Sequence, residues 1–143
     1  MTLHLIKLCV GVGTVPELAA WQARRLQDAR RVQEKPELFH VTRNTPRRGA
    51  EIIQGGSLYW VIKGLIVARQ RLLEFRRVDK DGVPHCALVL DAELVAVEPR
   101  VRRPFQGWRY LPDQDAPPDM SRGTDDADLP SALRRELISL GLL

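Results

Sequence analysis

The segment from Pro99 to Tyr110 has the residue types best suited to a chemical task. It holds four arginines and three aromatic residues and no acidic side chain. They are Arg100, Arg102, Arg103, Phe105, Trp108, Arg109 and Tyr110. Guanidinium groups donate paired hydrogen bonds to phosphate oxygens, and exposed aromatic rings stack on bases. The segment therefore indicates nucleic-acid binding; in the alternative interpretation the rings anchor a loop on the core and the arginines are solvated or paired with acids.

A second basic cluster consists of Arg43, Arg47 and Arg48. It precedes a predicted short helix, and helix N-termini favour anions because their backbone N–H groups lack partners. Taken alone, the cluster is typical of a solvated surface. Beside the first segment, Arg47 and Arg48 extend the predicted nucleic-acid surface.

A different hypothesis places Lys63, Arg69, Arg71 and Glu74 in a cleft. Such a cleft would belong to an enzyme or small-molecule domain that acts on a phosphorylated or nucleotide ligand. It requires a concave pocket in which the basic residues converge with Glu74 or His85. Structural ion pairing is the other explanation for these charges.

The remaining reactive residue types form no motif. Cys9 and Cys86 lie far apart with no C-x-x-C spacing, so the sequence predicts neither a disulfide framework nor a metal site. His85 and Cys86 are adjacent, and on a strand they point to opposite faces. Gly11-Val12-Gly13 opens like a dinucleotide fingerprint, but Pro16 holds the third glycine position, which favours a plain turn. The sequence predicts no cofactor and leaves open whether the protein is an enzyme.

Charge is distributed unevenly along the 143 residues. Residues 1–112 carry 19 basic and 11 acidic side chains, a net charge of +8, whereas residues 113–143 carry 3 and 7, a net charge of −4. The basic residues are 18 arginines and 4 lysines. Arginine enrichment suits phosphate recognition, although GC-rich codon usage gives the same bias.

The periodicity of apolar residues predicts the elements that would position these residues. We expect a central strand from Leu3 to Cys9 and, after a Thr14 to Glu17 capping box, a helix from about Val15 to Arg30. Later strands are expected at Leu38 to Thr42, Leu58 to Ile62, His85 to Leu90 and Leu94 to Val97, with a short helix from Thr45-Pro46 to Gly55. Asp79 to Gly82 predicts a hairpin turn.

Two stretches are harder to assign. Leu65 to Arg77 matches both a helical face and a strand face, and we favour a helix or turn that enters a strand near Leu73. Residues 113–129 are rich in Pro and Asp and are expected to form a linker, followed by a short amphipathic helix over residues 130–143. This acidic linker is expected to fold back over the basic segment.

Three motifs carry a family resemblance: the run from Gly56 to Gly64, the triplet Arg69-Gln70-Arg71, and the run from Arg103 to Tyr110. With these, residues 1–120 resemble an uncharacterised family of short bacterial proteins that is known only as a domain of unknown function. The order of elements also resembles the RNA-associated barrels of the PUA, ASCH and EVE type. The first resemblance implies no activity, and the second implies a fold analogy with RNA binding.

Taken together, the sequence predicts one α+β domain over residues 1–112. It is expected to contain a curved mixed or antiparallel sheet with two or three helices, and a sheet that closes on itself would form a PUA-like barrel. No apolar run approaches the roughly 18 residues that span a membrane, so we expect a cytoplasmic protein. The leading hypothesis is binding of RNA or another single-stranded nucleic acid; an enzyme or a protein-interaction module are the alternatives. The sequence does not predict the oligomeric state.

Overall fold

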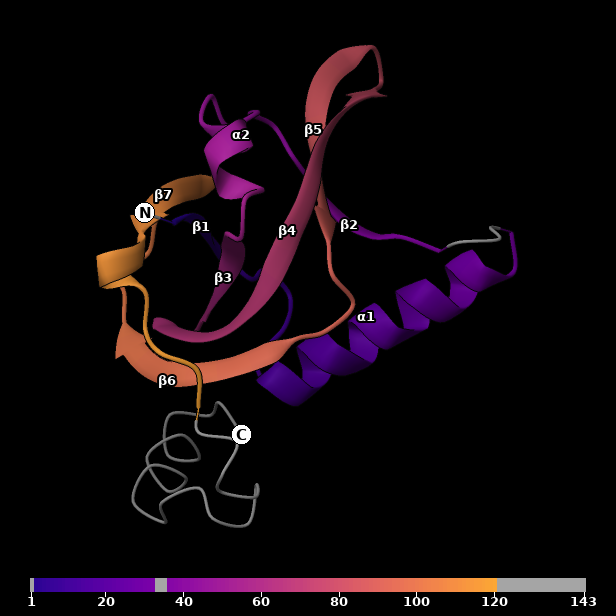
Figure 1. Ribbon diagram of the computed structural model, residues 1–143. Helices are drawn as coiled ribbons and strands as arrows, with labels where there is room; N and C mark the ends of the chain where they lie inside the picture. Colours follow the sequence, from indigo (N-terminus) through magenta and orange to yellow (C-terminus); the bar gives the residue numbers. More distant parts are fainter. Residues whose placement is uncertain (1, 33–35, 121–143) are drawn as a thin grey trace.

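The computed structural model describes residues 2–32 and 36–120. This part of the chain forms an α+β fold with a mixed sheet, as predicted (Figure 1). The α-helices are α1 (Val15–Arg30) and α2 (Gly49–Ile52). The strands are β1 (Leu3–Leu8), β2 (Leu38–Thr42), β3 (Ser57–Ile62), β4 (Leu65–Lys80), β5 (Val83–Leu90), β6 (Val95–Val101) and β7 (Trp108–Pro112).

The strands follow one another across the sheet in the order β2-β5-β4-β3-β1-β7, and β6 also pairs with β4. β1 runs parallel to β3 and antiparallel to β7, so it has a neighbour on both sides, as predicted for a central strand. The sheet curls but does not pair its end strands β2 and β7 with each other. The PUA-like barrel is therefore not confirmed.

The prediction for Leu65 to Arg77 was wrong, because this stretch belongs to a single strand of 16 residues, β4. Its first half is paired on both sides, by β3 and β6, and its second half pairs with β5. Register shifts interrupt these ladders, for example between Leu72 and Glu74. A bulge adds a residue and breaks the two-residue alternation, which is why the apolar pattern also fitted a helix.

The helix α1 begins and ends where the sequence predicted. The Thr14 hydroxyl accepts a hydrogen bond from the backbone N–H of Glu17 (3.2 Å), and the Glu17 carboxylate accepts one from the Gly13 N–H (3.2 Å). The second contact reaches one residue further back than in a standard capping box. The predicted helix from Thr45-Pro46 to Gly55 is shorter than expected, because only Gly49–Ile52 is helical.

The two faces of the sheet carry different apolar clusters. The helix side carries the larger apolar cluster, which includes Leu5, Leu58 and Leu72, and it receives Leu18 from α1 and Ile52 from α2. We call the opposite face the strap side. Its cluster consists of Ile6, Tyr59, Val61, Ile66, Val97 and Leu111, with Phe105 and Ala116 packed against it.

Residues 113–119, here called the strap, lie across the second face. They begin with a short 3-10 helix, Asp113–Asp115, and end in an antiparallel bridge between Asp119 and Val97 of β6. Backbone N–H groups of Glu98 and Met120 complete this junction by donating to Pro118 (2.9 Å) and Ala96 (3.0 Å). The first residues of the predicted linker thus have a defined place on the sheet, and the predicted helix 130–143 lies outside the described residues.

Candidate functional site

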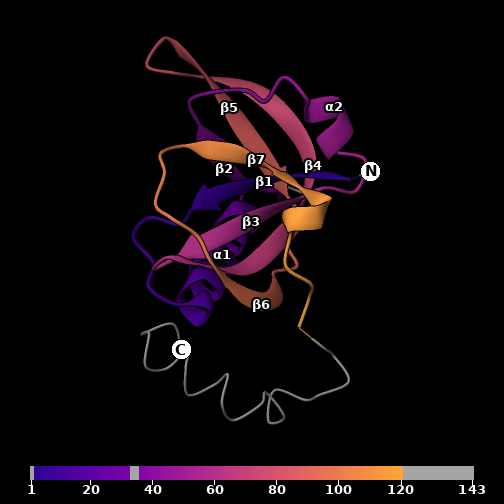
Figure 2. The ribbon, with the colours of Figure 1, turned by 90° about the vertical axis from the view of Figure 1, so that its left-hand side faces the viewer.

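The edge strand β7 brings the two predicted arginine clusters together. The indole N–H of Trp108 donates to the backbone oxygen of Asn44 (2.8 Å), and the backbone N–H of Arg48 donates to the Tyr110 hydroxyl (3.2 Å). The Arg48 guanidinium also lies 5.7 Å from the centre of the Tyr110 ring. Figure 2 looks onto β7, with the segment that leads to α2 above it. Residues more than 60 positions apart therefore form one surface at the end of the sheet.

The three aromatic rings of this segment are half-buried and turn toward the protein. Trp108 and Tyr110 alternate with Arg109 on β7 and pack against the cluster of the helix side, with their own rings 5.0 Å apart in an edge-to-face contact. Phe105 packs on the strap side. This arrangement agrees with the anchoring interpretation of the rings. They shape the surface, and the guanidinium groups are its exposed part.

Phe105 holds two of these guanidinium groups. Arg102 and Arg109 lie 5.4 and 5.6 Å from the centre of its ring, at distances typical of cation–π contacts. Arg109 also donates to the backbone oxygens of Gln106 and Trp108. These contacts fix the direction of both side chains without neutralising their charge.

Within the described residues, few arginines of this surface are paired with acids. Arg48 forms a salt bridge with Glu51 (2.7 Å), and the hydrogen bonds in that pair raise the pKa of the guanidinium. Arg100 donates to a backbone carbonyl, that of Asp115 (2.8 Å). No salt bridge to a described acid is formed by Arg47, Arg102, Arg103 or Arg109. Their positive charge is thus available to an anionic partner.

A shallow cavity of about 380 Å³ adjoins the second basic cluster, between the chain after β2 and the β4–β5 hairpin. Its lining is basic and consists of Arg43, Asn44, Thr45, Arg77, Pro84 and His85. Asn44 is also the residue whose carbonyl receives the Trp108 indole N–H. The cavity therefore continues the arginine surface toward the hairpin.

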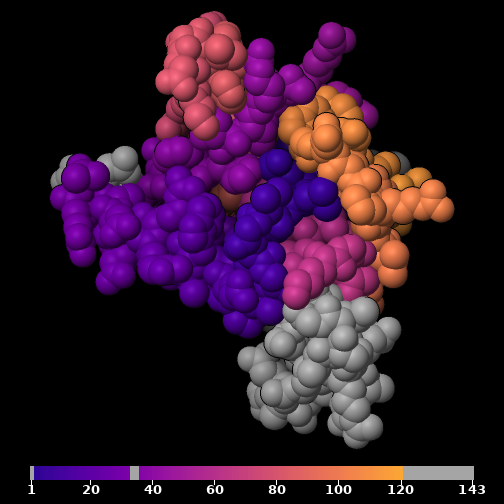
Figure 3. Space-filling view, turned by 180° about the vertical axis from the view of Figure 1, so that it is seen from behind, coloured from indigo at the N-terminus to yellow at the C-terminus, as the bar shows by residue number. Residues whose placement is uncertain are grey.

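Two further titratable residues, Lys7 and His40, lie on the helix side. Lys7 stands opposite Trp108 in the β1–β7 ladder, and its burial lowers the pKa of its ammonium group. His40 of β2 meets the ring of Trp60 edge-on, and its pKa is lowered to about 4 by burial first and then by the positive charges of Lys7 and Arg25. Figure 3 shows the start of the chain (indigo) between α1 and β7 (orange). His40 is therefore neutral near pH 7, and Lys7 is the positive group that adjoins Trp108 on this side.

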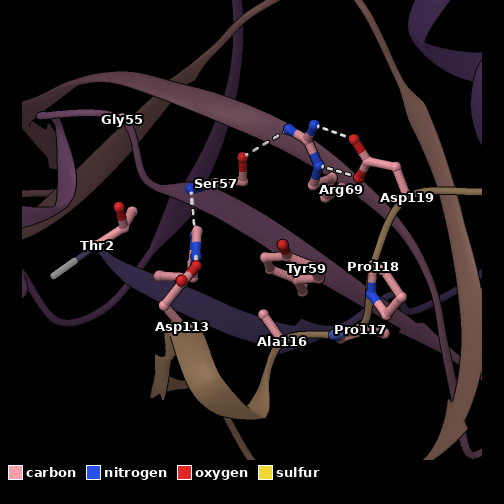
Figure 4. Close-up of a pocket in the computed structure, with 11 residues that line it drawn as sticks. Thr2, Gly55, Ser57, Tyr59, Arg69, Asp113, Ala116, Pro117, Pro118 and Asp119 are labelled. Atoms are coloured by element: carbon pink, nitrogen blue, oxygen red, sulfur yellow. Dashed lines mark hydrogen bonds and ion pairs between the residues drawn. The ribbon is translucent and has the colours of Figure 1, made fainter.

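A separate pocket of about 410 Å³ opens on the strap side, at the beginning of β1 (Figure 4). Three adjacent strands contribute polar side chains to it: His4 from β1, Ser57 and Tyr59 from β3, and Arg69 from β4. The pocket is open to solvent, and the strap forms one side of it with Asp113, Ala116, Pro117, Pro118 and Asp119, while Thr2 and Gly55 complete the rim.

The hydrogen bonds of the pocket fix the proton positions of His4. Its Nδ1 accepts the backbone N–H of Ser57 (3.0 Å), so in the neutral ring the proton is on Nε2, which donates to Asp113 (2.8 Å). The Ser57 hydroxyl instead accepts from Nη1 of Arg69 (3.1 Å). Ser57, His4 and Asp113 are therefore not arranged as a hydrolytic triad, in which the imidazole must accept the serine proton. The geometry suits binding.

The family model described as "Protein of unknown function (DUF1489)" matches residues 5–143. The chain belongs to this family. The match confirms the predicted membership of a family that is known only as a domain of unknown function. It also covers residues 121–143, which lay beyond the predicted resemblance. No curated protein and no solved structure matches the chain. The family therefore supplies no ligand or reaction, and the site has to be judged from its own geometry.

The alternative cleft predicted for this family member is not assembled as expected. Of its four residues, Arg69 lines the strap-side pocket, whereas Lys63, Arg71 and Glu74 do not. Lys63 lies in the β3–β4 turn with a positive φ of 49°, and Glu74 pairs with Arg76 (2.8 Å). His85, the other expected partner, lines the basic cavity instead.

Sequence reasoning missed most of the pocket. The sequence assigned His4 and Tyr59 to predicted strands and gave them no role in a site. Ser57 directly precedes the predicted strand Leu58 to Ile62, and Asp113 and Asp119 fall in the predicted linker. A signal was present, because Ser57 and Tyr59 alternate with Leu58 and so share one face of a strand. Polar residues recurring at two-residue spacing in a buried strand indicate a polar site on that face.

Other chemistries find little support in the described part of the chain. No three His, Cys, Asp or Glu side chains there are grouped to hold a metal ion, and no helix there is long and apolar enough to cross a membrane. Burial raises the pKa of Cys9 to about 11, and it raises that of Cys86 as well. Both thiols stay protonated near neutral pH, which makes them poor nucleophiles.

Proposed function

We propose that the protein binds single-stranded nucleic acid, RNA in particular, through the arginine surface along β7. The observation that carries the proposal is the pair of hydrogen bonds, Trp108 to Asn44 and Arg48 to Tyr110, that joins the clusters of residues 43–48 and 100–109. Each cluster taken separately is typical of solvent-exposed charged side chains. Joined by these hydrogen bonds, the two form one positively charged surface. Adjacent phosphates along a strand need such a continuous surface.

The arginines act on phosphates in this proposal, and the aromatic residues position them. Arg102 and Arg109 are held on the Phe105 ring, so binding a phosphate costs them less conformational entropy than it would cost side chains that move freely. Arg47, Arg48, Arg100 and Arg103 extend the surface. Trp108 shapes it through its bond to Asn44. The preference for RNA over DNA rests on the resemblance to PUA-type domains, which is a fold analogy.

Fluorescence anisotropy with a short labelled RNA and the matching single-stranded DNA, over a series of salt concentrations, tests the proposal. Each phosphate contact on a single strand contributes about 0.7 to the slope of log K against log salt, because it releases a counterion. The double variant Arg102→Ala and Arg103→Ala should lower that slope by about 1.4. Binding that does not depend on salt would refute the proposal.

A matched control is the pair Arg30→Ala and Arg31→Ala, which removes the same charge from the exposed end of α1. This variant should keep the slope of the unmodified protein. An equal loss in both double variants would show that bulk charge, and not the surface along β7, binds the strand. Equal affinities for RNA and DNA would remove the RNA preference.

A further inference from the structure

The strap-side pocket contains an arginine whose hydrogen-bonding fork is already filled by a carboxylate of the same chain. Nε and Nη2 of Arg69 each donate to one oxygen of Asp119 at 2.6 Å, and Nη1 donates to Ser57 (3.1 Å). Two parallel N–H donors facing two oxygens is the geometry in which arginine recognises carboxylate and phosphate groups. Asp119 therefore occupies the position that such a group of a ligand would take.

Asp119 can leave this position without unfolding the strap. The backbone on either side of it is bonded to β6 through the Pro118 oxygen and the Met120 N–H, independently of the side chain. The Arg69 and Asp119 side chains are 26% and 45% exposed, so water already reaches the pair. Ion pairs with this exposure contribute little to stability. The Asp119 carboxylate can therefore move off Arg69 while the backbone of the strap stays bonded to β6.

The Tyr59 hydroxyl is a second group that is available to a ligand. Tyr59 is only 5% exposed, yet no described residue forms a hydrogen bond with its hydroxyl, which points into the pocket beneath Arg69 (Figure 4). Burial raises the pKa of this phenol, so it remains a donor at neutral pH. No buried side-chain N or O atom of the described residues lacks a partner, so this hydroxyl is open to the pocket although its ring is buried, and a ligand in the pocket can reach it.

The size of the pocket sets the class of ligand. Its volume of about 410 Å³ falls in the range of small-molecule sites, about 300 to 1,000 Å³. It exceeds many times the space of one water molecule, about 30 Å³ in the liquid. The pocket therefore has room for an organic molecule in addition to the anionic group that would contact Arg69.

We propose that this pocket binds a small organic anion, whose carboxylate or phosphate group displaces Asp119 from Arg69 and accepts a hydrogen bond from Tyr59. Asp119 then acts as an internal competitor that lowers the affinity in the resting protein. The pocket shares no lining residue with the basic cavity and contains none of the arginines of the surface along β7, so a ligand bound here does not occupy the proposed nucleic-acid site.

The test is an NMR titration of the full chain with succinate and, separately, with inorganic phosphate at constant ionic strength, followed at the Nε–H of Arg69. Asp119→Asn should tighten binding of the preferred anion about two- to fivefold, the range expected when an exposed ion pair stops competing. Arg69→Lys should abolish saturable binding, because lysine keeps the charge but loses the fork. Tyr59→Phe should weaken binding several-fold.

Asp79→Asn is the matched control, since it removes an exposed carboxylate that faces Arg77 outside the pocket. It should leave the affinity unchanged. Equal gains in the two asparagine variants would trace the effect to net charge and overturn the proposal. So would the absence of a saturable shift at Arg69 in Asp119→Asn with both anions. The anion with the higher affinity identifies the ligand as a carboxylate or a phosphate.

Discussion

Replacing Gln70 by leucine should destabilise the protein more than almost any other conservative change. Gln70 is fully buried, and its amide joins α1 to the sheet. Its oxygen accepts from Gln22 and from the Trp60 indole, both at 2.8 Å, and its nitrogen donates to Gln22 (2.8 Å) and to the backbone oxygen of Asp91 (3.1 Å). Leucine has a similar volume but can make none of these four bonds.

The magnitude follows from the groups that lose their partners. Gln22 is 4% exposed and Trp60 is 2% exposed, so water cannot readily replace Gln70. Each buried polar group left without a partner costs about 1 to 3 kcal/mol. The amide of Gln22 and the indole N–H of Trp60 together predict a loss of about 3 to 5 kcal/mol in the free energy of unfolding, after partial relaxation. Losses of this size are exceptional for single substitutions.

Urea denaturation followed by tryptophan fluorescence measures this loss. The double variant Gln22→Leu and Gln70→Leu should be less destabilised than Gln70→Leu alone, because it removes both amides and leaves fewer groups unpaired. Gln27→Leu, an exposed position on α1, is the control and should change stability by less than about 0.5 kcal/mol. This reasoning would be refuted if Gln70→Leu lowered the free energy of unfolding by less than about 1 kcal/mol. It would also be refuted if the double variant were less stable than Gln70→Leu alone.

Two other changes test the helix side and the arginine surface. The pKa of His40, about 4 in the folded protein, lies below the ordinary value of 6.5, so the unfolded chain binds the proton more tightly between these values. Stability should therefore fall by up to about 3 kcal/mol as the pH drops from 6.5 to 4, and His40→Gln should reduce this fall in urea denaturation at each pH. An unchanged pH profile would contradict the assigned pKa. Tyr110→Phe removes the hydroxyl that accepts the Arg48 N–H but no charge, so RNA affinity measured by anisotropy should fall about two- to threefold with an unaltered salt slope. A lower slope would show that charge contacts, and not positioning, were lost.

The sequence predicted those elements in which local pattern and long-range packing agree. The helix α1 has its cap and its final arginine in the expected places, and β3 is bounded by glycines and fully buried. β4 failed because its pattern depends on its partners. Its first half is enclosed by two strands, its second half has an exposed face, and bulges shift the alternation between them. None of these causes is local to the stretch itself.

The candidate site was likewise predicted only where its residues are close together in the sequence. A run of arginines is visible in the sequence, so both arginine clusters could be predicted from it. Their union was not predictable, because it depends on two hydrogen bonds between residues more than 60 positions apart in the sequence. The strap-side pocket was missed, since its polar residues come from three strands and the strap and are dispersed along the chain.

The strap also bears on the expectation that the acidic segment folds back over the basic one. Among its described residues one contact of this kind exists, from Arg100 to the backbone oxygen of Asp115, while the carboxylate of Asp119 is directed to Arg69 in the pocket. A carbonyl holds a guanidinium without neutralising it, so Arg100 keeps its charge for a phosphate. The acidic side chain instead restrains the arginine of the pocket. In the proposed scheme the strap therefore regulates the small-ligand site and leaves the arginine surface open.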